Sequence, residues 1–260
     1  MSFFQQAKYH LTYYLNAVNQ HSLQAPFIYE LYTTVIKSDK LNGDFSEIEL
    51  IRESLARNGQ MLKIEELGAG SKNSNSISRT VKSIANGGLT SPKYSALLYR
   101  LIKHFHMRQV VELGTSLGVN TLYLAKYEAT KVTTFEGSPE IADVAQSIFD
   151  QQQAHNIKII RGNIDRTLSS FLDGSIHPDL VYMDANHKYE ATMKYFNTVL
   201  HNKHDETIVV IDDIKWSKSM QKVWKEIIDH PEVTLSIDLN KCGIVFFKPD
   251  FTKQHYVLAF

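Results

Sequence analysis

The alternation of short apolar runs with amphipathic segments from residue 109 onward constrains the fold of this 260-residue chain more than any other feature. The apolar runs are rich in Val and Ile, and the segments between them have helical periodicity. Strands of this kind belong to a parallel sheet covered on both faces, because right-handed crossovers place helices there. The sequence therefore predicts a doubly wound α/β fold.

We expect seven strands in this part of the chain, at residues 109–113, 131–135, 157–161, 180–183, 207–211, 233–238 and 243–247. The predicted helices are 117–127, 139–153, 164–172 and 189–200, followed by one with Met220, Val223, Trp224 and Ile227 on one face. Asn240 and its neighbours suit a short hairpin between the last two strands. The sheet is thus expected to be mostly parallel and to finish in a C-terminal antiparallel strand.

Residues 1–88 are predicted to form a helical region followed by a polar loop, and residues 89–260 to form the α/β domain. Pro26 suits the first turn of one helix, and Asp44 or Ser46 can cap the next. Helix-spaced aromatic residues in this region are expected mainly in the core, with a substrate pocket or a dimer surface as alternatives. They are Tyr9, Tyr13, Tyr14, Phe27, Tyr29 and Tyr32.

The polar stretch 67–78 contains G-A-G, but no β-branched run precedes it and a Ser/Asn/Lys tract follows it. We expect a loop, which is either an active-site lid or a plain linker.

Composition excludes some classes of partner. The 28 basic and 28 acidic side chains cancel, so no global field favours nucleic acid or an anionic membrane. The chain has one cysteine, Cys242, beside an apolar run, and we interpret it as a buried residue without a chemical role. Neither a basic n-region before an apolar stretch nor a run of membrane-spanning length is present, so a cytoplasmic protein is expected.

Polar or glycine-rich residues follow each of the first five predicted strands. In an open parallel sheet, ligands bind at the carboxyl ends of the strands, so these residues are the candidate site. The strand ends are residues 114–118, Glu136 with Gly137, Gly162 with Asn163, residues 184–187, and Asp212 with Asp213.

The first of these ends reads V-V-E-L-G-T-S-L-G over residues 110–118 and predicts a strand, a tight turn and a helix N-terminus. Glu136 lies 22 residues beyond Gly114, where a carboxylate can accept both hydroxyls of a ribose. Two ligands fit, a nicotinamide dinucleotide or the adenosine of S-adenosylmethionine (SAM). Ser116 stands where a dinucleotide turn usually has its middle glycine, and Glu112 suits an amino group better than a pyrophosphate.

The successive motifs E-L-G-T-S-L-G, F-E-G, R-G-N, D-A-N-H and D-D resemble those of class I SAM-dependent methyltransferases. The resemblance is strongest to the small-molecule O-methyltransferases related to the catechol and caffeoyl-coenzyme A enzymes, and it runs from about residue 89 to residue 247. It includes the S-P-x-x-x-x-L-L helix at 91–98. An N-terminal H-S-x-x-x-P-F-x-x-x-L-Y stretch, 21–32, resembles a bacterial group with a helical extension. The family implies a Rossmann-like, seven-stranded sheet.

The resemblance also implies roles for individual residues. The methionine end of the cofactor would be held by Glu112, Gly114, Thr115, Ser116 and Gly118. Glu136 would bind the ribose hydroxyls, Gly137 and Asn163 would flank the adenine, and Asp184 is a further candidate cofactor contact.

Metal-dependent members of this family place an Asp after the fourth strand, a Lys three residues later as the base, and an Asp-Asn pair after the fifth. This chain has Asp184, His187 and Asp212 with Asp213 at those positions. The three carboxylates are candidate ligands for Mg²⁺ or another divalent cation, or they serve helix capping and cofactor contacts instead. An imidazole can accept a proton from a hydroxyl near neutral pH, so His187 is the candidate general base, with Asp184 beside it.

The function predicted from these motifs is O-methylation of a small hydroxylated acceptor by direct displacement from SAM. The alternatives are a nicotinamide-dependent oxidoreductase and a non-catalytic cofactor-binding module. A nucleic-acid substrate is disfavoured by the balanced charge, and no membrane partner is expected. The acceptor is not identified by any motif, and a homodimer remains open.

Overall fold

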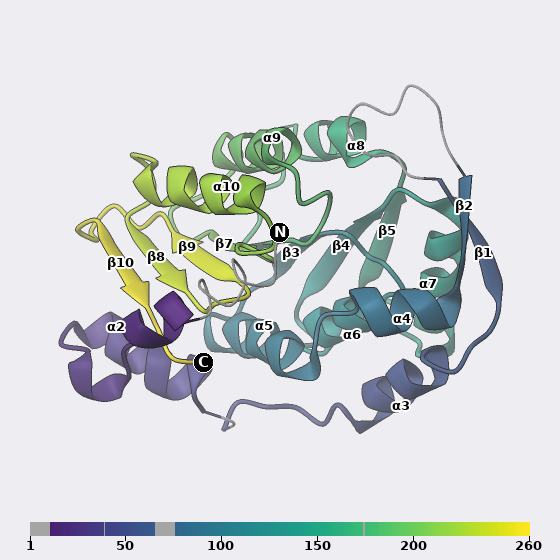
Figure 1. The fold of residues 1–260 in the computed structure, drawn as a ribbon, viewed down its shortest axis with the longest axis horizontal. Coiled ribbons are helices and arrows are strands. Elements are labelled where there is room, and N and C mark those ends of the chain that lie inside the picture. The colour runs from purple at the N-terminus through teal and green to yellow at the C-terminus, as the bar shows by residue number, and fades with distance from the viewer. Residues whose placement is uncertain (1–10, 39, 66–75, 174) are drawn as a thin grey trace. The chain divides into compact units, whose positions relative to one another are not determined.

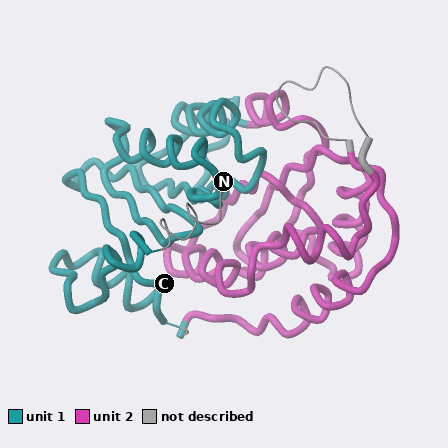
Figure 2. Tube along the Cα trace, in the orientation of Figure 1, with its two compact units in different colours: residues 1–40, 172–260 teal, residues 41–171 magenta. Residues whose placement is uncertain are grey.

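The structure of this chain, a computed structural model, describes residues 11–38, 40–65, 76–173 and 175–260. It divides into two compact units (Figure 2). Unit 1 comprises residues 1–40 and 172–260, and unit 2 comprises residues 41–171. The domain boundary predicted between residues 88 and 89 coincides with neither limit and stays a prediction.

Three parallel strands in the order β3, β4, β5 form the sheet of unit 2 (Figure 1). Leu113 pairs with Phe135 and Glu136 with Arg161, so the carboxyl ends of the three strands lie in register. The elements are α5 (Pro92–His104), β3 (Gln109–Leu113), α6 (Val119–Ala125), β4 (Lys131–Glu136), α7 (Pro139–Gln151), β5 (Ile157–Arg161) and α8 (Ile164–Phe171). All of these elements were predicted. Their predicted and observed ends differ by at most two residues, except at the C-terminal end of α5, for which no bound was predicted.

The first part of unit 2 contains an antiparallel hairpin that the sequence analysis missed. This part of unit 2 consists of α3 (Ser46–Leu55), β1 (Met61–Glu65), β2 (Ser76–Thr80) and α4 (Val81–Gly88), and β1 and β2 form the hairpin. Residues 67–75 of the predicted loop lie outside the described residues, but 76–78 belong to β2, which pairs with β1. These two strands have five residues each, and cross-strand pairing rather than a local apolar pattern makes them strands.

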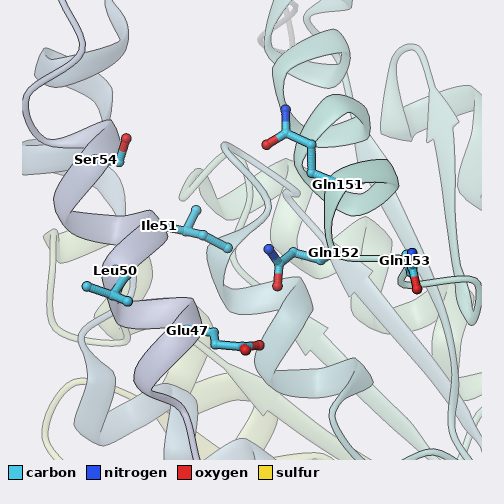
Figure 3. Close-up of a pocket in the computed structure, with 7 residues that line it drawn as sticks. All are labelled: Glu47, Leu50, Ile51, Ser54, Gln151, Gln152 and Gln153. Carbon is cyan, nitrogen blue, oxygen red and sulfur yellow. The ribbon is translucent and has the colours of Figure 1, made fainter.

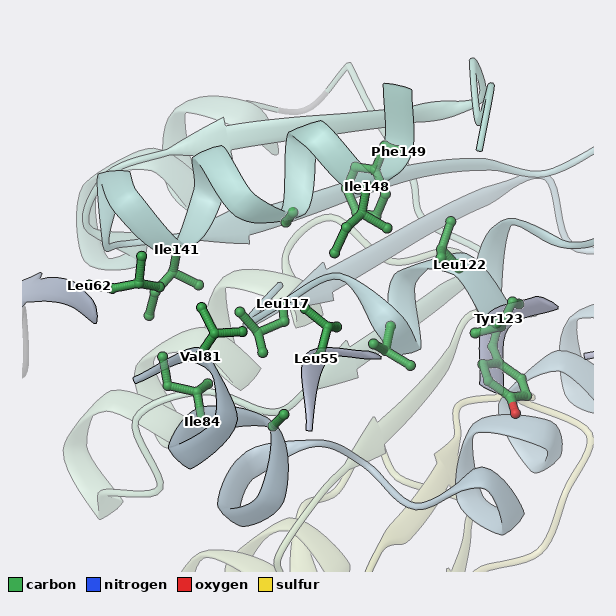
Figure 4. Packing of buried hydrophobic residues seen from close by; sticks show 14 of the residues in the cluster. Leu55, Leu62, Val81, Ile84, Leu117, Leu122, Tyr123, Ile141, Ile148 and Phe149 are labelled. Carbon is green, nitrogen blue, oxygen red and sulfur yellow. The ribbon is translucent and has the colours of Figure 1, made fainter. Parts of the chain in front are cut away.

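An apolar cluster between α3, α4, α6, α7 and β1 forms part of the core of unit 2 (Figure 4). Leu117, which lies within the glycine turn of residues 114–118, is fully buried in this cluster, and Phe149 of α7 packs in it as well. The turn after β3 is therefore held on one side by the core. Asp44 accepts a hydrogen bond from the amide of Ser46 at 2.9 Å, but the N-cap of α3 is Phe45, which makes no side-chain capping hydrogen bond, so the predicted cap by Asp44 or Ser46 is wrong.

In unit 1 the strand order is β10, β8, β9, β7, β6. Its elements after residue 172 are β6 (Leu180–Met183), α9 (Tyr189–Leu200), β7 (Ile208–Ile211), α10 (Lys218–Asp229), β8 (Leu235–Asp238), β9 (Gly243–Phe246) and β10 (Gln254–Val257). Strand β9 runs antiparallel to both β7 and β8, as predicted for a C-terminal antiparallel strand. Strand β10, Q-H-Y-V, was not predicted; it is a partly exposed edge strand defined by its pairing with β8.

The N-terminal part of unit 1 is helical, as predicted. Residues 11–16 form a helix, followed by η1 (Gln20–Ser22), α2 (Pro26–Leu31) and the π-helical turn η2 (Tyr32–Ile36). The expectation that its aromatic residues are core holds for Tyr13 and Tyr32, whose hydroxyls donate to the carbonyls of Leu258 and Ala259. It is wrong for Tyr14 and Tyr29, which are 70% and 47% exposed. Phe27 is half-buried, and Tyr9 lies outside the described residues.

Cys242 is buried, as predicted, and burial raises the pKa of its thiol well above the ordinary value. In the part of the chain that the structure describes, every helix is too short or too polar to cross a membrane.

Candidate functional site

The ends of the strands carry most of the unusual backbone of the described residues. Seven non-glycine residues have positive φ, and five of them follow strands: Ser116 after β3, Asn186 and His187 after β6, Asp213 after β7, and Asn240 after β8. Such conformations cost free energy and persist where the surroundings fix them, which is common at functional sites. The strand ends are therefore the candidate functional site.

The turn after β3 in unit 2 requires its glycines. Gly114 and Gly118 have φ values of 105° and 81°, and the amides of Gly114 and Thr115 both donate to the carbonyl of Phe135 on β4. A Cβ on Gly118 would lie 2.7 Å from the ring of Phe149. Only glycine combines this conformation with this close packing, so the turn is a rigid feature at the start of α6.

Glu112, predicted to hold the methionine end of a cofactor, is engaged inside unit 2. Its carboxylate is fully buried and accepts hydrogen bonds from Asn120 Nδ2 at 2.8 Å, Thr121 Oγ1 at 2.5 Å and Thr134 Oγ1 at 2.7 Å. Burial raises the pKa of Glu112 to about 7, against the opposing effect of these three donors. Glu112 therefore ties α6 to β4.

Asn120, Thr121 and Thr134 were not selected from the sequence. The signal was available for the first two, because they are polar residues in the first turn of an otherwise apolar helix. Thr115, which was predicted, shares a 2.7 Å hydrogen bond with the hydroxyl of Thr134. Among the described residues, Asn120 Oδ1 is a buried acceptor with no hydrogen bond, although Asn120 is only 7% exposed. A buried polar atom of this kind needs a partner.

Glu136 at the end of β4 is connected to the glycine turn. Its Oε2 accepts from the amide of Ser116 and its Oε1 from the amide of Ser138, each at 2.9 Å. Burial raises the pKa of Glu136, and the amides of Ser138, Ser116 and Gly137 oppose this effect. Because the two carboxylate oxygens together have four lone pairs, the carboxylate retains capacity to accept from a ligand. The structure thus brings Ser116, Glu136 and Gly137 together.

Asn163 follows β5 and begins α8. Its Oδ1 accepts from the amide of Asp165 at 2.8 Å, and its carbonyl accepts from the amides of Arg166 and Thr167. The preceding Gly162 has a φ of 120° and its amide donates to the carbonyl of Glu136. These contacts place Asn163 at the third strand end, beside Glu136, with its side chain partly engaged in capping.

In unit 1, Asp184, His187 and Asp213 form a compact group. His187 Nε2 lies 3.4 Å from Asp184 Oδ1 and 3.9 Å from Asp213 Oδ2. One donor atom from each of the three residues lies within 4.8 Å of the others. Asn186 anchors this loop by donating from Nδ2 to the hydroxyl of Tyr195 at 2.8 Å. A proton accepted by the imidazole would be stabilised by two carboxylates.

Asp212 is held differently from its neighbour Asp213. Its side chain is 1% exposed, and its Oδ2 accepts from the hydroxyl of Tyr182 at 2.9 Å and from Lys241 Nζ at 2.6 Å. Burial and the charge of Asp212 raise the pKa of Asp213, while Lys241 and His187 lower it. Asp212 precedes Asp213 in the sequence but is not part of the group that Asp184, His187 and Asp213 form. Its buried carboxylate is paired with Tyr182 and Lys241 instead.

Lys241 was not among the residues selected from the sequence. It lies in the turn between β8 and β9, after Asn240, and its Nζ is also 3.9 Å from Asp213 Oδ1. No local motif marks it, because its contact with Asp212 depends on the pairing of β9 with β7.

Elsewhere in unit 2, a surface cavity of about 530 Å³ lies between α3 and the end of α7 (Figure 3). Its lining residues are Glu47, Leu50, Ile51, Ser54, Gln151, Gln152 and Gln153. None of the site residues predicted from the sequence lines it, and its single ionisable side chain has no convergent partner. We therefore base the candidate site on the strand ends and not on this cavity.

Comparison with known proteins supports this choice. Residues 111–214 match a protein family described as a methyltransferase domain, and this segment contains all of the predicted site residues. The chain is 33% identical over 150 residues to O-methyltransferase hkm8 of Aspergillus hancockii, which is 53% of this chain and 56% of that protein. It is 34% identical over 102 residues to a putative O-methyltransferase of Mycolicibacterium vanbaalenii, which is 38% of this chain and 44% of that one.

The chain thus spans about half the length of the curated relatives it matches. Among solved structures, an O-methyltransferase from Bacillus cereus in complex with SAH aligns with a TM-score of 0.58 at 19% identity, over 84% of this chain and 99% of that one. This similarity shows the fold and confirms the predicted α/β class with a mostly parallel sheet. The predicted resemblance to methyltransferases is likewise confirmed by the match over residues 111–214.

Proposed function

We propose that this chain, whose residues 111–214 match the methyltransferase domain family, transfers a methyl group from SAM to a hydroxyl oxygen of a small acceptor. The observation that carries the proposal is the composition of the matched segment. It contains both a rigid glycine turn joined to Glu136 and a histidine beside two carboxylates. The first suits a nucleoside ligand, and the second suits removal of a proton from a hydroxyl.

The cofactor half of the proposal rests on unit 2. The Glu136 carboxylate retains acceptor capacity beyond its contacts with the amides of Ser116 and Ser138, as binding of ribose hydroxyls requires. Asn120 Oδ1, buried and without a hydrogen bond among the described residues, can accept from an ammonium or hydroxyl donor of a ligand. Gly114, Thr115, Ser116 and Gly118 shape the turn, and Gly137 and Asn163 follow the next two strands. These features fit a SAM molecule. Glu112 contributes indirectly, because its carboxylate accepts from Asn120 Nδ2 and so holds the Asn120 side chain in place.

The acceptor half rests on unit 1. Bound SAM supplies a methyl group already activated by its sulfonium, so this chain needs only to orient the acceptor and remove its proton. His187 would take that proton, and Asp184 and Asp213 would stabilise the resulting imidazolium. No covalent enzyme intermediate is required.

Mg²⁺, one of the divalent cations considered from the sequence, does not fit this donor set well, although Asp184, His187 and Asp213 lie close enough together to hold an ion that accepts an imidazole. Asp212, one of the three predicted ligands, already accepts from Tyr182 and Lys241. The group that does converge has an imidazole in place of a third oxygen, whereas Mg²⁺ prefers oxygen ligands in near-octahedral geometry. The Lys241 ammonium lies 3.9 Å from Asp213 Oδ1. We therefore assign no step of the reaction to a metal.

A small acceptor is favoured over a nucleic acid because basic and acidic side chains balance. The relatives named above are methyltransferases, so they give no support to the oxidoreductase alternative. A homodimer is a separate proposal, motivated by the exposed Tyr14 and Tyr29 of unit 1 and tested by sedimentation.

Calorimetric titration with SAM and with S-adenosylhomocysteine (SAH) tests the cofactor assignment. We expect saturable one-to-one binding, and substitution Glu136→Gln should weaken it about tenfold or more, because hydrogen bonds to a charged group are lost. Glu128→Gln, at an exposed position of the same unit, is the matched control and should bind as the wild type does. Absence of binding by the folded wild-type protein would remove the proposal. NADH that competes with SAH would favour the oxidoreductase.

A further inference from the structure

We propose that Lys241 is a built-in cation that occupies the carboxylate cluster at the ends of β6 and β7, so that this site works without a divalent metal. The cluster consists of Asp184, Asp212 and Asp213. The inference deepens the proposed function, because it concerns what the same acceptor site requires.

The first support is the geometry of the ion pair. Lys241 Nζ lies 2.6 Å from Asp212 Oδ2, a distance typical of a strong charge-assisted hydrogen bond, and 3.9 Å from Asp213 Oδ1. The side chain of Asp212 is 1% exposed, whereas that of Lys241 is 33% exposed. A carboxylate buried to this degree needs a compensating charge, and Lys241 supplies it from the side that remains accessible.

The second support is that the backbone fixes the position of Lys241. The carbonyl of Lys241 accepts a hydrogen bond from the amide of Ile214 at 3.0 Å, directly after Asp213. Two residues further on, Gly243 pairs with Ile211, and a Cβ there would lie 2.4 Å from the ring of Trp224. The lysine is thus attached to the same loop as the carboxylates it contacts.

The third support is electrostatic. Carboxylates at the ends of two strands act on Lys241: Asp184 follows β6, and Asp212 and Asp213 follow β7. They place negative charge around the Lys241 ammonium, whose Nζ lies 2.6 Å from Asp212 Oδ2. A divalent cation that reached Asp213 would meet this fixed positive charge at close range. At such separations the repulsion weakens binding by about tenfold or more.

Titration with Mn²⁺, followed by electron paramagnetic resonance, tests the proposal without SAM or an acceptor. Wild-type protein should bind Mn²⁺ weakly. Lys241→Gln, which removes the charge but keeps most of the side chain, should bind at least about tenfold more tightly. The matched control is Lys215→Gln, because Lys215 makes a 2.9 Å ion pair with Asp238 in the same unit and is similarly shielded. It should bind Mn²⁺ as weakly as the wild type.

Equal affinities in wild type and Lys241→Gln, or tight stoichiometric binding by the wild type, would overturn the proposal. Should Lys241→Gln fail to fold, the wild type decides alone. We expect its melting temperature to be unchanged by millimolar Mn²⁺, whereas a rise that disappears in Asp213→Asn would overturn the inference. Failure of SAM to bind would refute the proposed function. The Mn²⁺ titrations could still be interpreted, because they use neither SAM nor an acceptor.

Discussion

The carboxylates at the strand ends of the two units are compensated in different ways. In unit 2, Glu112 and Glu136 accept hydrogen bonds from neutral amide and hydroxyl groups, and burial raises the pKa of both. In unit 1, Asp212 is paired with the ammonium of Lys241, and Asp213 lies between Lys241 and His187. Neutral donors position an acidic group without cancelling its charge, whereas an ammonium cancels it.

This difference suggests a division of tasks. The carboxylates of unit 2 hold a turn and offer acceptors, as a neutral or cationic nucleoside ligand requires. Those of unit 1 surround an imidazole and a lysine, as proton transfer requires.

The largest effect is expected from His187→Ala in unit 1. Loss of a general base lowers the rate of methyl transfer by about 10²- to 10⁴-fold, while SAM affinity should change little. The measurement is single-turnover methyl transfer together with SAM titration. His201→Ala is the control, because His201 is exposed and bonds only to the Asn197 carbonyl of its own helix. Turnover of His187→Ala at the wild-type rate would remove His187 as the base.

The next largest effect is expected in unit 2, on the free energy of unfolding. Gly118→Ala should destabilise the fold by about 3 kcal/mol, from the left-handed backbone and the contact with Phe149. Urea unfolding measures this change. Gly87→Ala, in α4, meets nothing within 4 Å and should instead stabilise the protein by about 0.5–1 kcal/mol. If both variants unfold at the wild-type urea concentration, the turn is less constrained than we infer.

A pH-dependent effect is expected from Glu112, whose pKa of about 7 in the folded protein exceeds the ordinary value of 4.5. Between these pH values the folded protein retains a proton that the unfolded chain releases, so stability falls as the pH rises from 4.5 to 7. The share due to Glu112 is about 3 kcal/mol, on the order of 1.4 kcal/mol per pH unit. Unfolding of Glu112→Gln measured from pH 5 to 8 should show a flatter profile. A slope identical to that of the wild type would contradict the assignment.

The smallest effect is expected from metal removal. Because Lys241 already compensates Asp212, treatment of the wild-type protein with a chelator should leave the rate of methyl transfer within about twofold of its initial value. A rate that is lost on chelation and restored by a divalent cation would show that unit 1 depends on a metal.

Much of the fold was predictable from the sequence, because its signals are local. The seven strands β3 to β9 and the helices between them follow from apolar runs and helical periodicity. The glycine turn was predictable because only glycine tolerates the backbone at Gly118. The hairpin of β1 and β2 and the edge strand β10 were missed, since short polar strands are defined by their partners.

By itself, the sequence determined the α/β class, the turn at residues 114–118 and the list of polar strand ends. The tertiary structure decided which partners those polar groups have. Glu112 meets Thr134, 22 residues away, and Asp212 meets Lys241, 29 residues away. Both contacts cross strand boundaries and depend on the β-ladder register, which fixes which side chains face each other, and no local pattern of residues encodes that register. Glu112 and Asp212 could therefore be recognised as candidate site residues from the sequence. Their hydrogen-bond partners, and the role of Lys241, followed only from the fold.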